Sequence, residues 1–174
     1  MIDLTLDELK ESGNDLYNRN NDDEARLFYE LYLDQNPTDQ EVLYNLGELY
    51  FFVGEWDLSL KVLGMLVTLD KNNSWAWNYI GLISLLSKHF KEAEEALRKA
   101  VENDPDVSVF WVNLSKVFNT RRAYDLAEWA ARKAIDIEPT LTTAWVNLRK
   151  AAYMQRSHKL IKIADVKLKE LIYD

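Results

Sequence analysis

Few side chains in this sequence have the types and spacing that catalysis or metal binding requires. The two histidines, His89 and His158, fall in predicted turns, and neither has a cysteine or a second histidine at ligand spacing. Residues 70–74 read Asp-x-Asn-x-Ser, like the start of a calcium loop, but Trp75 stands where such a loop needs glycine. No glycine-rich phosphate loop is present. The sequence therefore predicts no enzyme, no cofactor and no metal site.

Composition narrows the remaining classes of protein. The chain has 174 residues, of which 48% are hydrophobic, enough for a single domain over residues 1–174. Its net charge of −8, without a basic stripe, argues against nucleic-acid binding. It has no cysteine, no targeting signal and no apolar run long enough to insert into a membrane. We expect a cytoplasmic protein with a protein or peptide partner.

The elements that would position a binding surface repeat every 34 residues. An end marker, a small residue, a tryptophan and an alanine-type position all share this spacing, which makes coincidence very improbable. The four sets are Pro37, Lys71, Pro105 and Pro139; Gly13, Gly47, Gly81 and Ser115; Trp77, Trp111 and Trp145; and Ala25, Ser59, Ala93 and Ala127.

Each copy contains two segments with helical spacing of its apolar residues. Intervals of three and four trace one face of a helix, the small residues suit close helix crossings, and proline suits a helix boundary. We expect helix starts at two capping boxes, beginning at Thr5 and at Thr38, and at a cap provided by Ser74.

This pattern resembles the tetratricopeptide repeat family. The third copy carries the family's motif as Trp77, Ile80, Gly81, Phe90, Ala93, Leu97, Ala100 and Pro105. The resemblance implies an all-α fold, a right-handed solenoid of antiparallel helix pairs with about ten helices. The implied repeats cover residues 6–39, 40–73, 74–107, 108–141 and 142–174, the last as a fifth or capping helix pair.

The resemblance also implies a function, which is binding of a peptide or helical segment in a concave groove lined by the first helix of each pair. Large apolar residues occupy several groove positions that are usually polar, and asparagines occupy others. The predicted groove residues are Tyr44, Asn45, Phe51, Phe52, Trp75, Asn78, Tyr79, Leu82, Leu86, Asn113 and Asn147. Trp75 should face this groove, because residues two apart on a helix point about 200° away from each other and Trp77 belongs to the repeat motif.

Two known groove types in the family can be compared with this sequence. The carboxylate clamp that holds acidic chaperone tails is matched by Lys10, Asn14 and Asn45, but its last two cations fall on Trp75 and Tyr79. We therefore predict no affinity for such a tail. The asparagine ladder that holds an extended peptide backbone is matched by Asn45, Asn113 and Asn147 and interrupted by Tyr79.

Two further features leave alternative functions open. The helix at residues 58–70 has apolar residues on all sides, which suggests a homodimer or partner contact. Residues 149–174 carry a net charge of +4 against −12 for the rest, which could steer partners or promote head-to-tail assembly. The alternatives are therefore a small acidic chaperone resembling those of type III secretion translocators, or a self-assembling structural module.

Overall fold

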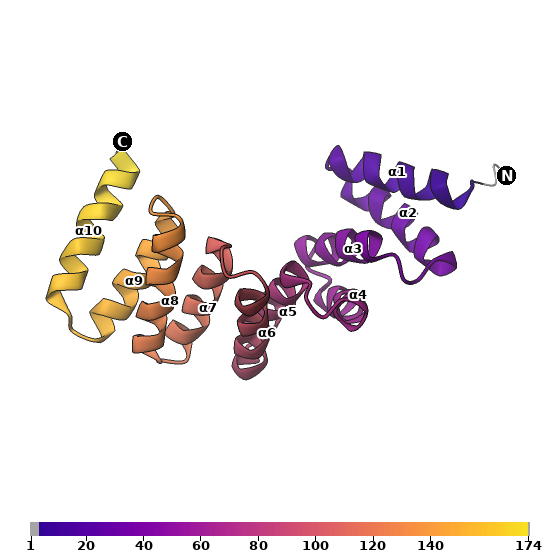
Figure 1. Cartoon of the computed structure of the whole chain (residues 1–174). Coiled ribbons are helices and arrows are strands. Elements are labelled where there is room, and N and C mark those ends of the chain that lie inside the picture. The colour runs from indigo at the N-terminus through magenta and orange to yellow at the C-terminus, as the bar shows by residue number, and fades with distance from the viewer. Residues whose placement is uncertain (1–3, 174) are drawn as a thin grey trace. The chain divides into compact units, whose positions relative to one another are not determined.

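A computed structural model describes residues 4–173 of the chain, which form ten α-helices and no strand (Figure 1). The helices are α1 (Leu6–Asn18), α2 (Asp22–Gln35), α3 (Gln40–Phe52), α4 (Trp56–Leu69), α5 (Ser74–Leu86), α6 (Phe90–Asn103), α7 (Ser108–Thr120), α8 (Tyr124–Ile137), α9 (Thr142–Met154) and α10 (His158–Tyr173). This confirms the prediction of an all-α fold built from consecutive helix pairs.

The chain packs as two compact units, and the boundary between Ile80 and Gly81 lies inside α5. In the first unit α1 packs on α2 and α3 on α4, while α2 contacts α3. In the second unit α7 packs on α8 and α9 on α10, and α7 also contacts α6 and α9. Figure 1 shows each pair joined by a tight turn.

Glycine marks the closest crossing within the helix pairs. A Cβ atom added at Gly47 would lie 2.5 Å from Leu63 Cδ2, and one added at Gly81 would lie 2.6 Å from Leu97 Cγ. Real Cβ atoms do not approach other atoms so closely, so only glycine allows these helices to pack at this distance. The repeated small residue is therefore explained by helix packing.

The tryptophan and proline ladders belong to one repeated interaction. The indole Nε1 of Trp111 donates a hydrogen bond to the carbonyl of Pro105, and that of Trp145 donates to the carbonyl of Pro139. Trp77 donates in the same way to the carbonyl of Lys71. Because the acceptor is a backbone oxygen, lysine can stand where the other copies have proline.

Two predicted helix caps are wrong, while a third is confirmed. Thr5 and Glu8 form the expected capping box at α1. At α3, however, the cap is Asp39, whose carboxylate accepts from the backbone N–H groups of Glu41 and Val42, and not Thr38. At α5, Asn73 accepts from the N–H of Ala76, which places Ser74 inside the helix. In both cases the actual cap lies one residue from the predicted one, because aspartate and asparagine are at least as favourable at this position as serine and threonine.

The helix at the end of the chain is more apolar outside than expected. Ala164 and Leu168 are buried, as an inner stripe should be, but Ile163 and Val166 are exposed beside the lysines.

Among residues 4–173, no helix is long and apolar enough to cross a membrane.

Candidate functional site

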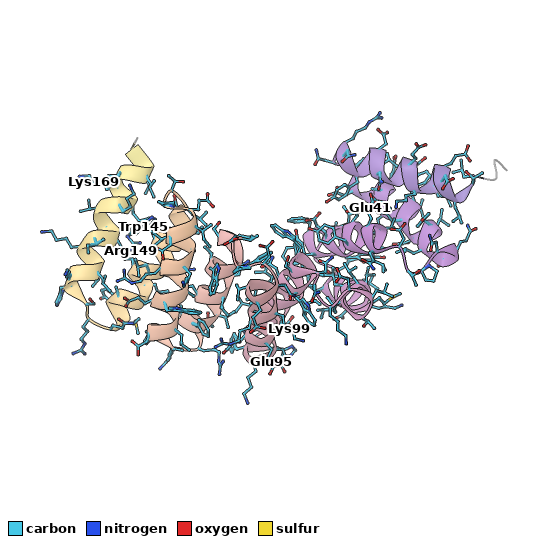
Figure 2. All side chains as sticks on the ribbon, in the orientation of Figure 1. Glu41, Glu95, Lys99, Trp145, Arg149 and Lys169 are labelled. Carbon is cyan, nitrogen blue, oxygen red and sulfur yellow. The ribbon has the colours of Figure 1, made fainter. Side chains whose placement is uncertain are left out.

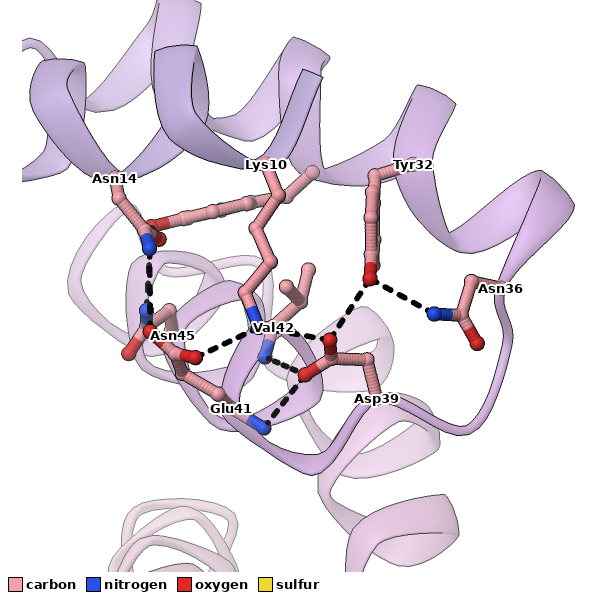
Figure 3. Close-up of polar contacts among 9 residues, drawn as sticks. Lys10, Asn14, Tyr32, Asn36, Asp39, Glu41, Val42 and Asn45 are labelled. Carbon is pink, nitrogen blue, oxygen red and sulfur yellow. Dashed lines mark hydrogen bonds and ion pairs between the residues drawn. The ribbon is translucent and has the colours of Figure 1, made fainter. Parts of the chain in front are cut away.

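The first helices of the unit that ends at Ile80 are joined by a charged cluster. Lys10 of α1 reaches α3, where its Nζ lies 2.8 Å from Asp39 Oδ2 and 2.7 Å from Glu41 Oε2 (Figure 3). Hydrogen bonds to Asp39 and then to Glu41 raise the pKa of the Lys10 ammonium above its usual range. Burial opposes ionisation of Asp39, but hydrogen bonds from Lys10 and Tyr32 lower the pKa of its carboxyl group. The ammonium group of Lys10 therefore stays charged, and its charge is balanced by two carboxylates of the same chain.

Next to this cluster, uncharged side chains of α1, α2 and α3 form a series of hydrogen bonds. Tyr29 is buried and donates a hydrogen bond of 2.8 Å to Asn14 Oδ1, while it accepts one of 3.2 Å from Asn45 Nδ2. Asn14 in turn donates to Glu41 Oε1 at 3.1 Å. The amides of Asn14 and Asn45 thus serve neighbouring helices, so neither is held ready for a ligand.

A single carboxylate, that of Glu48, collects three tyrosine hydroxyls. Tyr17 of α1 donates to its Oε2 atom, and Tyr79 of α5 donates to its Oε1 atom. Tyr44 lies one turn before Glu48 on α3 and donates to Oε1 at 3.4 Å. Burial, and then the charge of Glu48, raise the pKa of Tyr44 to about 12. Burial and the hydrogen bond to Glu48 raise the pKa values of Tyr17 and Tyr79 above their usual range.

Aromatic rings cover this carboxylate and reach the solvent. The ring of Tyr79 lies 5.0 Å from that of Phe51, 6.3 Å from that of Phe52 and 6.2 Å from that of Tyr44, between centroids. Tyr79 is buried, whereas Phe52 is 66% exposed and Trp75 is 41% exposed. We call Tyr44, Phe51, Phe52 and Tyr79 the aromatic cluster. The buried ring of Tyr79 and the half-buried ring of Phe51 pack against Phe52, which itself is open to a partner.

Two surface hollows in the unit that ends at Ile80 are lined mainly by polar and acidic groups. One of about 310 Å³ is lined by Tyr17, Asn18, Asn20, Asp22, Glu48, Leu49 and Phe52. Another of about 400 Å³ lies over Asp7, Lys10, Glu11 and Asn14. Lys10 is already paired with Asp39 and Glu41. The surface around these hollows therefore presents carboxylates and aromatic rings, which suit a ligand with basic and apolar groups.

The other predicted groove residues differ in their surroundings. Asn78 is buried, Leu82 and Asn113 are half-buried, and Leu86 is exposed. Asn147 Nδ2 donates to the carbonyl of Val112 at 3.0 Å, so this amide also joins neighbouring helices. The amides of Asn45 and Asn147 are thus used within the chain, and binding of a ligand backbone by the asparagines stays a prediction.

Sequence reasoning missed the role of Glu48 and Tyr17. Tyr17 and Glu48 are 31 residues apart, and so are Glu48 and Tyr79. This spacing is three residues shorter than the repeat, because side chains on successive first helices meet along a diagonal. A search for polar pairs at this shorter spacing could have found the cluster.

Comparison with known proteins identifies one sequence repeat and the fold of this chain. Residues 74–107 match the model of the family described as tetratricopeptide repeat, and these are the bounds of the third predicted copy. The fold matches that of a MamA double mutant with a TM-score of 0.88 at 20% identity, over 95% of this chain and 93% of that one. Residues 74–107 therefore form a tetratricopeptide repeat, and the described residues have a tetratricopeptide-like all-α fold of ten paired helices.

Further comparisons extend the likeness without adding a function. MamA from Desulfovibrio magneticus has a TM-score of 0.87 at 20% identity, covering 95% of this chain and 94% of that one. PilF from Pseudomonas aeruginosa has 0.81 at 17% identity, covering 95% and 75%. Hsp70-Hsp90 organizing protein 1 from Glycine max is 27% identical over 100 residues, which is 58% of this chain but only 18% of that relative. At these identities the solved structures show a shared fold alone.

Proposed function

We propose that the chain is a non-catalytic scaffold that binds a peptide or helical segment of a partner protein, with Phe52 and Trp75 as apolar anchors. Tetratricopeptide repeat proteins are typically protein-interaction scaffolds without catalysis. The observation that carries the proposal is the aromatic cluster, where Phe52 is 66% exposed although its neighbours are packed. Exposed aromatic anchors on a rigid base commonly dominate partner binding. We place this activity in the cytoplasm as part of the proposal.

The charges around the anchors point to a ligand with basic residues. Glu41 is exposed on α3, and Glu11 and Asp7 are exposed on α1. Residues 1–80 hold sixteen acidic and five basic side chains, a net charge of −11. Charge complementarity of this kind raises association rates and selects among partners.

The same charges argue against the ligand implied by the name of the Glycine max relative. An acidic chaperone tail would need free cations, but Lys10 is bound to Asp39 and Glu41, and Trp75 and Tyr79 supply none. The proposal therefore excludes an acidic C-terminal peptide as the ligand of this face.

Matched peptides test the proposal by calorimetric titration of the intact chain. Two peptides share the same leucine and phenylalanine residues, and one carries lysine and arginine where the other carries aspartate and glutamate. We expect only the basic peptide to bind. Trp75→Ala should weaken that binding by about 2 kcal/mol, as loss of a buried anchor does, with little loss of stability.

A control variant separates anchor loss from general damage. Leu58→Ala removes an exposed apolar side chain from α4, on a helix that the proposal leaves to other contacts. It should leave peptide affinity unchanged. Tighter binding of the acidic peptide, or a Trp75→Ala protein that unfolds yet binds normally per folded molecule, would refute the proposal.

The apolar helix α4, predicted over residues 58–70, supports a second, separate contact. Its exposed residues Leu58, Met65 and Leu69 fit the homodimer contact predicted from the sequence. Sedimentation at increasing protein concentration tests this contact, and Met65→Asp should reduce any dimer found.

A further inference from the structure

The outward face of α9 is open where the same face of α7 is covered. Val112 and Asn119 on α7 are only 7% and 4% exposed, and α9 packs against this helix. At the equivalent positions of the next copy, Val146 and Tyr153 are 41% and 70% exposed. The repeat places both pairs in the same register. The solvent-exposed face of α9 therefore corresponds to the face of α7 on which α9 packs.

This open face forms a trough between α9 and α10. Two hollows, of about 490 and 450 Å³, share the side chains of Tyr153, Met154 and Ile161. Val146 extends the first hollow along α9. Tyr153 and Met154 are both exposed, so the floor of the trough is apolar and accessible. We call Val146, Tyr153, Met154 and Ile161 the trough floor.

The rim of the trough is mainly basic. Lys150 borders the first hollow and Arg156 the second. Arg149, labelled on α9 in Figure 2, lies 3.2 Å from Asp165 of α10, an acidic side chain that lines the first hollow. Residues 149–174 hold seven basic and three acidic side chains in all. A partner with acidic flanks would complement this rim.

The other repeats show which residues a first helix uses to pack on the preceding first helix. The third and tenth residues of copies two, four and five are apolar and buried: Val42 and Leu49, Phe110 and Val117, Ala144 and Ala151. The first copy differs, because Glu8 and Asp15 occupy these positions and are exposed. Packing α1 of a second copy into the trough would bury two carboxylates against apolar side chains, which is costly. The occupant is therefore a different helix.

We propose that the α9–α10 trough binds an amphipathic helix from a partner protein, with an apolar stripe on the trough floor and acidic residues beside Lys150 and Arg156. The helix would pack on α9 and α10 as α9 packs on α7 and α8. This mode reuses the helix packing of the repeat itself. It involves no residue of the aromatic cluster, so it stands apart from the function proposed above.

Fluorescence anisotropy with the intact chain tests this site. The probe is a labelled helical peptide of about four turns, with alanine and leucine at i, i+4, i+7 and i+11 and glutamate on both flanks. One control peptide has the same composition in scrambled order, and another replaces each glutamate with lysine. We expect binding of the first peptide alone, weakened at high salt.

Variants locate the binding on the trough. Tyr153→Asp should weaken the peptide at least about tenfold, a loss of about 1.4 kcal/mol. Val166→Asp is the matched control, since Val166 is an exposed residue of α10 that lines a separate hollow with Trp145. Circular dichroism melting checks folding, and Met154→Asp takes the place of Tyr153→Asp should that variant unfold.

Three results would overturn the proposal. The first is equal binding of the striped and scrambled peptides, or no binding of either. The second is a Tyr153→Asp or Met154→Asp protein that folds and binds as tightly as the unchanged chain. The third is light scattering that shows a concentration-dependent oligomer abolished by Tyr153→Asp, which would assign the trough to a second copy.

Discussion

Successive first helices are joined mainly by charges and tyrosines in the unit that ends at Ile80, but by amides in the unit that begins at Gly81. Between α1 and α3, Lys10 pairs with Asp39 and Glu41, and Tyr17 bonds Glu48. Between α7 and α9, Asn119 Nδ2 donates to the carbonyl of Asn147 at 3.1 Å, and Asn147 donates back to Val112. The same fold thus uses two kinds of polar contact.

The difference reflects how the two units distribute charge. Residues 1–80 have a net charge of −11, whereas residues 81–174 hold sixteen basic and thirteen acidic side chains, a net charge of +3. Long charged side chains span the α1–α3 contact, and short amides reach backbone carbonyls in the α7–α9 contact. The first contact should therefore respond to salt and pH, while the second should not.

The largest effect should appear where the two units are alike, at the glycine crossings. We expect Gly47→Leu and Gly81→Leu each to lower the free energy of unfolding by about 3 kcal/mol, because Leu63 and Leu97 leave no room for a side chain. Urea titration followed by circular dichroism measures this. Gly64→Ala is the control, since no atom lies within 4 Å of its added Cβ, and it should stabilise slightly. A large difference between the two leucine variants would show that the crossings are not equivalent.

Removing an amide from the second unit should have the next largest effect. Asn147→Ala leaves the carbonyl of Val112, on a buried residue, without its side-chain donor, which should cost about 1–2 kcal/mol. The same urea titration at low and high salt checks it. We expect equal losses at both salt concentrations, and a marked salt dependence would contradict the comparison.

Removing the charged link from the first unit should cost less. Lys10→Ala deletes both ion pairs to α3, for a loss of about 1 kcal/mol, since such pairs are partly screened by solvent. Unlike the loss in Asn147→Ala, this one should shrink as salt is added. If salt leaves it unchanged, packing of the lysine chain and not its charge supports the contact.

The smallest effect should be a shift in tyrosine ionisation in the first unit. Burial and Glu48 raise the pKa of Tyr44 to about 12, against about 10 in the unfolded chain. The folded protein therefore holds this proton longer, so the stabilisation is complete below pH about 10 and is lost as pH rises towards about 12. Absorbance of tyrosinate follows the titration. In Glu48→Gln the pKa should fall but stay above 10, because burial is the larger cause.

The sequence by itself determined the repeat, its helices and the residues at their crossings. Gly47 and Gly81 recur at the period of the fold because each helix pair repeats the same local packing, so periodicity alone identifies them. Phe52 and Trp75 were also singled out as aromatic residues, since large apolar side chains are unusual at groove positions, and both are exposed.

Only the tertiary structure decided how polar groups pair between repeats and which faces stay open. Tyr17 and Glu48 meet because successive first helices are offset, so their contact does not follow the repeat period. Tyr153 lies in the same register as the buried Asn119, and only the packing of α9 on α7 shows that one is covered and the other is not. Burial depends on which helix comes next in space, and a local sequence pattern does not contain that information.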